Sequence, residues 1–251
     1  MKIALVQLNG GDALWAVEQL PNLLGQATGN DLVVFPECMP FGDDEFPTLH
    51  KDAMKILEDA GKQVPDSTFL AGGYVSHEKH PRNRVYLVNR GKVIEWYDKQ
   101  IPWEGENFEL GDIAKCFEWE GKKCIPLICA DAGDDLTPRK VRMMFAALQA
   151  GAGPETPIVV CSYGGGLLTD YWQPALREWS NACNAPVVIC GIAGTHSTQT
   201  YVDKNEMIHP FGGGGSGAFW PSGPELQSGR RGIVVVNLDS QTLTWQAIRK
   251  N

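Results

Sequence analysis

Residues Asp31–Glu37 read Asp-Leu-Val-Val-Phe-Pro-Glu, and this stretch decides the fold class. Its apolar residues are consecutive and do not alternate with polar ones, which is typical of a strand that is covered on both faces. Pro36 ends the apolar run, and Glu37 places a carboxylate where the strand ends. Strands of this type lie in α/β sheets, whose ligands bind beyond the carboxyl ends of the strands. Glu37 is therefore the first candidate for a functional group.

The segments around this strand predict a layered α/β fold. Lys2–Asn9 has a strand pattern, and Asp12 is the expected N-cap of a helix whose leucines recur at helical spacing up to Leu24. The later elements are predicted as a helix over about 44–63, a strand over 68–75, a hairpin joining 84–88 to 93–98, a strand over 123–129, helices over 136–150 and 171–184, and strands over 157–162, 186–193, 216–221 and 231–238. Strands that alternate with helices in this way indicate layers. No linker divides the chain, so we expect a single domain over residues 1–251.

The charge balance excludes several classes of partner. The chain has 251 residues, and 22 Lys and Arg against 30 Asp and Glu give a formal net charge of −8. An acidic chain without a run of Lys or Arg lacks the basic surface that nucleic acids and anionic membranes require. The longest apolar runs are strand-sized and fall short of the ~18 residues that cross a bilayer. We therefore expect a small-molecule substrate, no nucleic-acid partner and no membrane partner.

The cysteines indicate a reducing compartment. There are seven, an odd number, and they are spread through apolar segments instead of forming a disulfide framework. The N-terminal strand reaches Gln7 and Asn9 before an apolar signal core can form. We therefore expect free thiols and a cytoplasmic protein.

Neither a metal nor another cofactor is expected. The pair His77 and His80, and the pair Cys124 and Cys129, lack the paired spacing of a closed zinc site. The glycine run 212–215 lacks the Lys and Ser or Thr of a phosphate-binding loop, so we interpret it as a loop between elements.

Three residues at predicted strand ends have side chains that suit acyl transfer: Glu37, Lys99 and Cys129. A thiolate can attack a carbonyl or nitrile carbon, a carboxylate can take the thiol proton and pass it to leaving ammonia, and an ammonium can stabilise the oxyanion. Each residue alone has a structural alternative. A cysteine in an apolar strand is most often a small buried hydrophobe, and a lone Lys or Glu is usually solvated.

The local sequences resemble the nitrilase superfamily of carbon–nitrogen hydrolases over nearly the whole chain. The similar motifs, in chain order, are Lys2–Leu8, Asp31–Glu37, Tyr97–Lys99 with Gly105–Gly111, Leu127–Asp131 and Ser216–Gly223. The order and spacing of the motifs suit that family. The resemblance implies a four-layer αββα sandwich.

The resemblance also implies the roles of the candidate residues. Glu37 would activate Cys129, and Lys99 with the backbone N–H of Ala130 would stabilise the tetrahedral intermediate. Ammonia would then leave, and water would hydrolyse the thioester.

The family uses a second glutamate after the lysine. Glu106 fits this position best because Phe108 and Gly111 follow it as the motif expects, and Glu104 is the alternative. A carboxylate within reach of Lys99 would keep the lysine charged and aim it.

The chain departs from the family pattern near the nucleophile, which puts its specificity in doubt. Ala130 replaces the usual aromatic residue, and Gly133, Asp134 and Asp135 replace the usual sequence just beyond. A later family motif is blurred over Leu176–Asn184. We propose Trp103, Tyr163, Trp172 and His196 as pocket residues, which favours a small uncharged amide. Core packing explains these aromatic residues equally well.

The sequence thus predicts a thiol amidohydrolase that cleaves a small linear amide or carbamoyl compound and releases ammonia. A nitrilase, a separate-chain glutaminase and acyl transfer to another nucleophile remain open, because all use the same triad. A catalytically silent scaffold also remains open because of the changes after Cys129. From the resemblance we expect a homodimer or a higher homo-oligomer.

Overall fold

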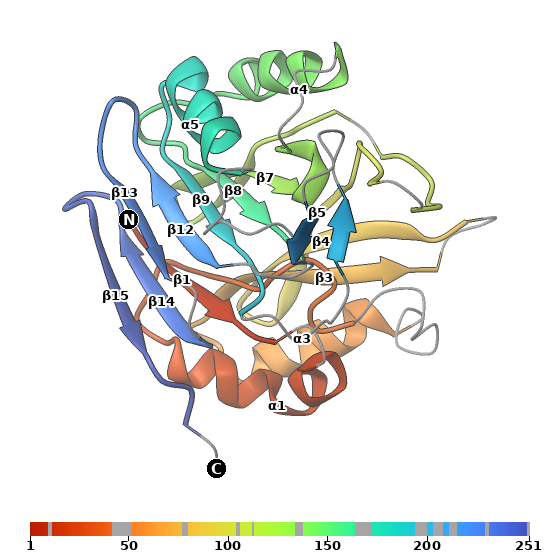
Figure 1. Cartoon of the computed structure of the whole chain (residues 1–251). Coiled ribbons are helices and arrows are strands. Elements are labelled where there is room, and N and C mark those ends of the chain that lie inside the picture. The colour runs from red at the N-terminus through yellow and green to blue at the C-terminus, as the bar shows by residue number, and fades with distance from the viewer. Residues whose placement is uncertain are drawn as a thin grey trace.

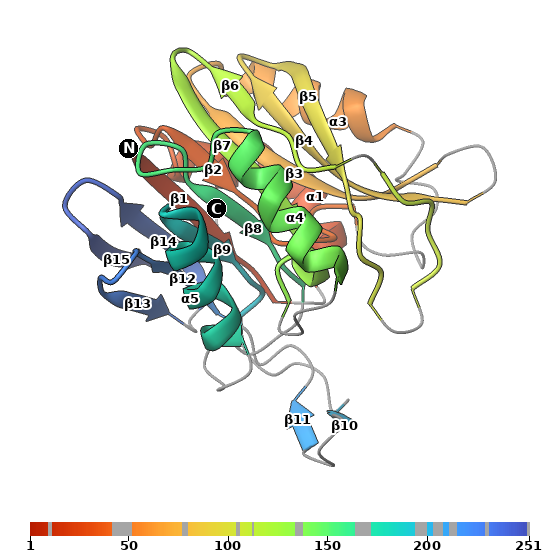
Figure 2. The ribbon, with the colours of Figure 1, turned by 90° about the horizontal axis from the view of Figure 1, so that it is seen from above.

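The computed structural model describes residues 1–9, 12–41, 52–76, 80–103, 106–111, 113–133, 138–163, 172–193, 200–202, 208–210, 215–228 and 231–249. In these ranges, two β-sheets pack face to face and helices cover the outer face of each sheet (Figures 1 and 2). The α/β class and the αββα sandwich predicted from the sequence are confirmed.

The larger sheet has seven strands in the order β15-β14-β1-β2-β3-β4-β5. Their bounds are β1 (Lys2–Gln7), β2 (Leu32–Val34), β3 (Thr68–Val75), β4 (Arg82–Asn89), β5 (Lys92–Asp98), β14 (Gly232–Asn237) and β15 (Thr242–Gln246). Strands β1, β2 and β3 are parallel, and β4 and β5 form an antiparallel hairpin. The helices α1 (Ala13–Gln26) and α3 (Ala53–Gln63) cover its outer face (Figure 1).

The smaller sheet has six strands in the order β13-β12-β9-β8-β7-β6. Their bounds are β6 (Phe117–Trp119), β7 (Lys122–Ile128), β8 (Ile158–Cys161), β9 (Val187–Cys190), β12 (Ser216–Phe219) and β13 (Glu225–Ser228). The helices α4 (Pro138–Gln149) and α5 (Trp172–Cys183) cover its outer face (Figure 2). A separate pair, β10 (Thr200–Val202) and β11 (Ile208–Pro210), is antiparallel.

The side-chain alternation of β1 shows how one strand serves two apolar layers. Ile3 and Leu5 belong to the core between the sheets, whereas Ala4 and Val6 pack with the residues of α1 and α3. Successive strand side chains point to opposite faces, so a sheet covered on both sides needs apolar residues at consecutive positions. The consecutive apolar pattern in the sequence therefore has a direct structural cause.

Several predicted boundaries differ from the observed ones. Strand β2 ends at Val34, so Glu37 lies in the turn beyond it and not on the strand. The helix predicted over 44–63 is α3 from Ala53 onward, and residues 44–51 lie outside the described residues. Asp12 takes the N-cap position of α1 but makes no capping hydrogen bond there. Its carboxylate accepts the Asn9 N–H instead.

The strands β6, β13 and β15 were not predicted. They are short or exposed edge strands, and they lack the apolar runs on which the sequence prediction depended. No helix of the described ranges is both long enough and apolar enough to cross a membrane.

Candidate active site

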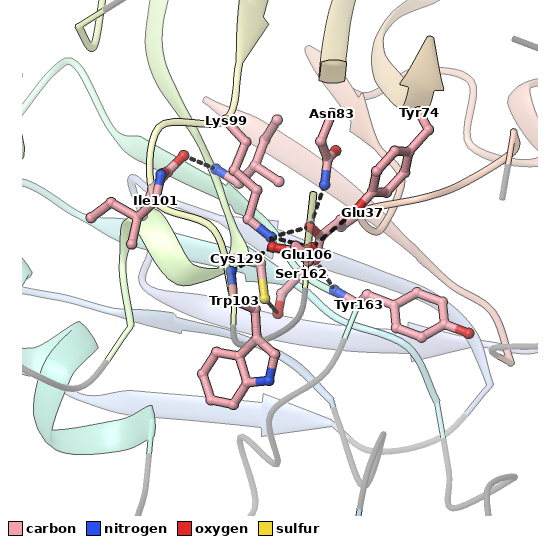
Figure 3. Close-up of polar contacts among 12 residues, drawn as sticks. Glu37, Tyr74, Asn83, Lys99, Ile101, Trp103, Glu106, Cys129, Ser162 and Tyr163 are labelled. Atoms are coloured by element: carbon pink, nitrogen blue, oxygen red, sulfur yellow. Dashed lines mark hydrogen bonds and ion pairs between the residues drawn. The ribbon is translucent and has the colours of Figure 1, made fainter. Parts of the chain in front are cut away.

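Four strand ends carry polar side chains that gather between the two sheets. Glu37 lies just beyond β2 and Lys99 follows β5 of the larger sheet, whereas Cys129 follows β7 and Ser162 follows β8 of the smaller sheet. Figure 3 shows the four side chains together in one cluster. The structure therefore brings together three residues that were predicted from the sequence and a fourth, Ser162, that was not.

Lys99 places a buried ammonium between two carboxylates. Its Nζ lies 2.7 Å from Glu37 Oε1 and 2.8 Å from each carboxylate oxygen of Glu106. An unpaired ammonium would be very unfavourable in a site where the residue is 1% exposed, so these ion pairs stabilise the charge. Burial lowers the pKa of Lys99, but Glu37, Cys129 and Glu106 together raise it well above its ordinary value. Lys99 is a cation at neutral pH.

The carboxylate of Glu37 is held by three donors. Oε1 accepts hydrogen bonds from Lys99 Nζ and from Asn83 Nδ2, the latter at 2.8 Å. Oε2 accepts the backbone N–H of Tyr163 at 3.0 Å (Figure 3). These donors come from β4, from the residue after β5 and from the segment after β8. Glu37 is therefore fixed in orientation by both sheets.

Glu106 is the second glutamate in contact with Lys99. Its Oε1 accepts a hydrogen bond from the Tyr74 hydroxyl at 3.2 Å, and its Oε2 accepts one from the Trp103 N–H at 2.5 Å. The ring of Phe108 lies 5.6 Å from Lys99 Nζ, which adds a cation–π contact. Glu106 takes the position that the motif indicated, and Glu104 lies outside the described residues.

Cys129 lies at a sharp turn between β7 and the short 3₁₀ helix η2 (Cys129–Asp131). Its φ is +43°, in the left-handed region that costs a non-glycine residue about 1–3 kcal/mol. The residue that follows, Ala130, is small and buried, and it lets the chain turn closely against the sheet. Strain of this kind persists only where the surroundings hold it, and it is common at functional sites. Ser162 donates a hydrogen bond from Oγ to Cys129 Sγ at 3.6 Å.

The electrostatics of the site keep the thiol protonated at rest. Burial raises the pKa of Cys129 and Glu37 raises it further, whereas Lys99 and the Ser162 hydroxyl lower it, and the pKa is about 12. Only the thiolate is an effective nucleophile, so attack by Cys129 at neutral pH requires a base that removes the proton. The carboxylate fixed in this cluster, Glu37, is suited to that task.

In the described ranges, no cluster of three or more His, Cys, Asp and Glu side chains is arranged to hold a metal ion. The side-chain groups described above are one thiol, two carboxylates, one ammonium, one amide and two hydroxyls.

Comparisons with known proteins agree with this architecture. No protein-family model matches the chain. It is similar to Omega-amidase YafV from Escherichia coli K12, with 23% identity over 193 residues, which cover 74% of this chain and 71% of that protein. The solved structure of Saccharomyces cerevisiae Nit3, a member of branch 10 of the nitrilase superfamily, matches with a TM-score of 0.70 and 19% identity over 95% of this chain and 89% of that one. The chain has the nitrilase-superfamily fold.

Two further structures match this nitrilase-superfamily fold. An amidase from Nesterenkonia sp. AN1, with acrylamide added to its active-site cysteine, matches at a TM-score of 0.69 and 20% identity over 94% of this chain and 92% of that one. Glutamine-dependent NAD+ synthetase from Acinetobacter baumannii matches all of this chain at a TM-score of 0.71 and 18% identity, but this chain spans only 47% of that protein. The TM-scores establish the nitrilase-superfamily fold, and identities this low leave the substrate open.

The predicted pocket residues take different places in the nitrilase-superfamily fold. Trp103 donates its backbone N–H to Glu106, and the ring of Tyr163 packs against a small cluster that includes Tyr74 and Phe108. Trp172 is 1% exposed at the start of α5 and belongs to the apolar core, which favours the core-packing interpretation for this residue. His196 lies outside the described residues.

Three side chains of the cluster were missed from the sequence: Tyr74, Asn83 and Ser162. Ser162 is the residue after β8, so the strand-end argument that nominated Cys129 also applies to it. Asn83 gave no such signal, because it lies between two arginines in β4 and resembles an exposed polar position. In the structure it is 1% exposed, and its amide donates to Glu37.

Proposed function

We propose that the protein is a thiol amidohydrolase that cleaves the C–N bond of a small linear amide or carbamoyl compound through a thioester on Cys129 and releases ammonia. The observation that carries the proposal is the buried ammonium of Lys99, held 2.7 Å from Glu37 and 2.8 Å from Glu106 in the same cluster as the Cys129 thiol. A charged lysine in such a place suits the stabilisation of an oxyanion. The similarity to an omega-amidase and to an amidase with a reactive cysteine supports the same activity.

The acylation step follows from the groups present. Glu37 accepts the proton of the Cys129 thiol, and Sγ attacks the amide carbonyl carbon. The carbonyl oxygen becomes an oxyanion, which Lys99 and the backbone N–H of Ala130 stabilise. The proton held by Glu37 passes to the amide nitrogen, the C–N bond breaks, and ammonia leaves. Cys129 then carries the acyl group as a thioester.

In the deacylation step Glu37 acts as the base again, now toward water. Glu37 accepts a proton from water while the water oxygen attacks the thioester carbon. The C–S bond breaks, the product leaves as a carboxylic acid, and the proton returns to Cys129 Sγ. Glu106 supports both steps because its negative charge keeps Lys99 protonated.

Other reactions use the same groups and are outcomes of the same test. A nitrilase would add water to a nitrile carbon, and an acyltransferase would pass the thioester to another nucleophile. A glutaminase would hydrolyse glutamine and supply ammonia to a synthetase on a separate chain. A silent scaffold would release nothing.

The test is a screen for ammonia release over small amides, carbamoyl compounds, nitriles and glutamine. Cys129→Ala should abolish release, and the matched control Cys116→Ala, which removes a partly buried thiol outside the site, should leave it unchanged. Release that survives Cys129→Ala, or the absence of release from every compound, contradicts the proposal.

We further propose a homodimer that pairs through α4. Val141, Phe145 and Leu148 are 39%, 63% and 41% exposed on this helix, and their spacing places them on one face. Light scattering should give a dimer for the wild type and a monomer for Phe145→Glu. Leu14→Glu, at an exposed leucine on α1, is the matched control and should leave the dimer intact.

The seven cysteines, which are all free thiols, support a reducing compartment, and we propose the cytoplasm.

A further inference from the structure

Asp131 presents a fully buried carboxylate at which four hydrogen bonds converge. Its Oδ1 accepts the backbone N–H groups of Gln100 at 3.0 Å and Ile101 at 2.8 Å. Its Oδ2 accepts the Tyr97 hydroxyl at 2.8 Å and the backbone N–H of Ile128 at 3.1 Å. The residue is 0% exposed, so water does not replace any of these donors.

The four donors belong to the two segments that carry the candidate lysine and nucleophile. Tyr97 and the Gln100 and Ile101 N–H groups flank Lys99 at the end of β5, in the larger sheet. The Ile128 N–H precedes Cys129 at the end of β7, in the smaller sheet, and Asp131 itself lies two residues after the thiol. One carboxylate therefore ties the two sheets together at the active site.

We propose that Asp131 is a positioning residue that fixes Lys99 relative to Cys129 and so sets the rate of thioester formation. This inference rests on the proposed amidohydrolase function. The physical reason is that an oxyanion contact is effective only when the ammonium and the nucleophile hold a defined separation, and a displacement of ~1 Å can reduce the rate about 100-fold.

The four hydrogen bonds to the Asp131 carboxylate, here called the Asp131 clamp, suit an ionised carboxyl group. Three of the four partners are backbone N–H groups, which only donate, so a proton on the carboxyl group finds an acceptor only in the Tyr97 hydroxyl, and only if that hydroxyl turns and stops donating. Burial raises the pKa of Asp131 to about 6, and Lys99, the Tyr97 hydroxyl and the backbone N–H groups oppose the rise. Tyr97 and Lys99 are the titratable groups that act on it, and both have pKa values raised well above their ordinary range. The carboxyl group is therefore charged above about pH 6 and becomes protonated as the pH falls through that value.

Two variants test the clamp on the full-length protein. Asp131→Asn keeps the shape but turns one acceptor into an amide N–H₂ that faces donors. Tyr97→Phe removes one of the four hydrogen bonds and leaves the carboxylate. Tyr86→Phe is the matched control because it removes the hydroxyl of a buried tyrosine in the neighbouring strand β4, on the outer, helix-covered face of the sheet.

The measurements are kcat per reactive Cys129, counted by intact-mass titration, and its dependence on pH. In Asp131→Asn, kcat should fall about 100-fold, and in Tyr97→Phe about 3-fold to 10-fold. Wild-type activity should decline as the pH falls through about 6. This decline should be absent from Asp131→Asn, because nothing remains there to titrate. In Tyr97→Phe it should move to higher pH, because the lost hydrogen bond favoured the ionised form.

The rate at which iodoacetamide alkylates Cys129, followed by peptide mass spectrometry, gives the same pH midpoint without a substrate. If ammonia release fails while the alkylation midpoint behaves as stated, the proposed function is wrong and the clamp stands. If Asp131 had a purely structural role, Asp131→Asn would lower the melting temperature and the number of reactive sites. It would leave kcat per reactive site and the pH midpoint unchanged, and that result overturns the proposal. If Asp131→Asn does not fold, Tyr97→Phe decides: a midpoint equal to that of Tyr86→Phe overturns the clamp.

Discussion

Asn83 contacts both the proposed base, Glu37, and the lysine proposed to stabilise the oxyanion, Lys99. Its side-chain amide donates to Glu37 at 2.8 Å, and its backbone oxygen accepts the Lys99 N–H at 2.8 Å. Lys99 Nζ and the Asn83 amide both donate to the same oxygen, Glu37 Oε1. One residue of β4 thus fixes the orientation of the carboxylate and the backbone of the lysine. The contact to the lysine uses only the backbone, so side-chain substitutions test the contact to Glu37 separately.

Asn83→Ala should reduce kcat about 10-fold with little change in KM, because it frees Glu37 without touching the substrate. The readout is steady-state ammonia release. Asn89→Ala, at the other end of the same strand, removes an amide that accepts a hydrogen bond from Thr68 outside the site and is the matched control. An unchanged kcat in Asn83→Ala would show that the orientation of Glu37 does not depend on this amide.

Glu37→Gln should make alkylation of Cys129 depend on hydroxide. Burial is the largest cause of the raised pKa of Cys129 and remains in this variant, so the thiol stays protonated in the neutral range although the loss of the Glu37 charge lowers its pKa. Without the carboxylate as base, the thiolate fraction and the alkylation rate should rise ~10-fold for each pH unit below the thiol pKa. The measurement is the rate of iodoacetamide labelling of Cys129 between pH 7 and pH 9. A flat profile in this variant means that another group removes the proton.

Ser162→Ala should slow alkylation of Cys129. The hydroxyl donates to Sγ at 3.6 Å and lowers the pKa of the thiol, so its removal should raise that pKa and reduce the thiolate fraction. We expect a labelling rate several-fold below that of the wild type at pH 8. Ser162→Thr retains a hydroxyl and should recover part of the loss. Equal labelling rates in the wild type and Ser162→Ala would show that the Ser162 hydroxyl does not affect the reactivity of Cys129.

Gly72→Ala should strongly destabilise the larger sheet. A Cβ at Gly72 would lie 1.9 Å from the backbone oxygen of Arg84, so β3 and β4 would have to separate next to Asn83. We expect a loss of several kcal/mol in the free energy of unfolding, well above the median effect of a substitution. Gly25→Ala in α1 is the control, because nothing lies within 4 Å of its added Cβ, and it should stabilise by about 0.5–1 kcal/mol. Chemical denaturation measures the free energy of unfolding of both variants. Equal values for Gly72→Ala and Gly25→Ala would contradict the close packing of Gly72 against Arg84.

The main layers of the fold could be predicted from the sequence because the elements that form them have strong local signals. The β4–β5 hairpin is an example: Arg90 and Gly91 have positive φ values of 50° and 70°, as its tight turn requires. The edge strands β13 and β15 were not predicted because neither has a run of consecutive apolar residues; the alternation of polar and apolar residues over Thr242–Gln246 is the signal that indicates β15. Leu14 shows the converse, because it fits the helical spacing of α1 and is nevertheless 51% exposed.

The candidate site was predictable where a residue type and a strand end coincided, as for Glu37, Lys99 and Cys129. It was not predictable where the function of a side chain depends on a contact between distant segments. Asn83 and Asp131 belong to this second group. Asn83 donates to Glu37, 46 positions away, and three of the four donors to Asp131 lie 30 to 34 positions away. Local sequence gives no measure of such contacts.

The central claim is that Cys129 forms a thioester with the substrate. The most direct measurement is intact-mass spectrometry of the protein, quenched in acid during turnover of the best amide from the screen. The account predicts a mass increase equal to the acyl group on the peptide that contains Cys129, its loss after treatment with hydroxylamine, and its absence from Cys129→Ala. Ammonia release at the wild-type rate by Cys129→Ala, with no acylated species in either protein, would contradict the account.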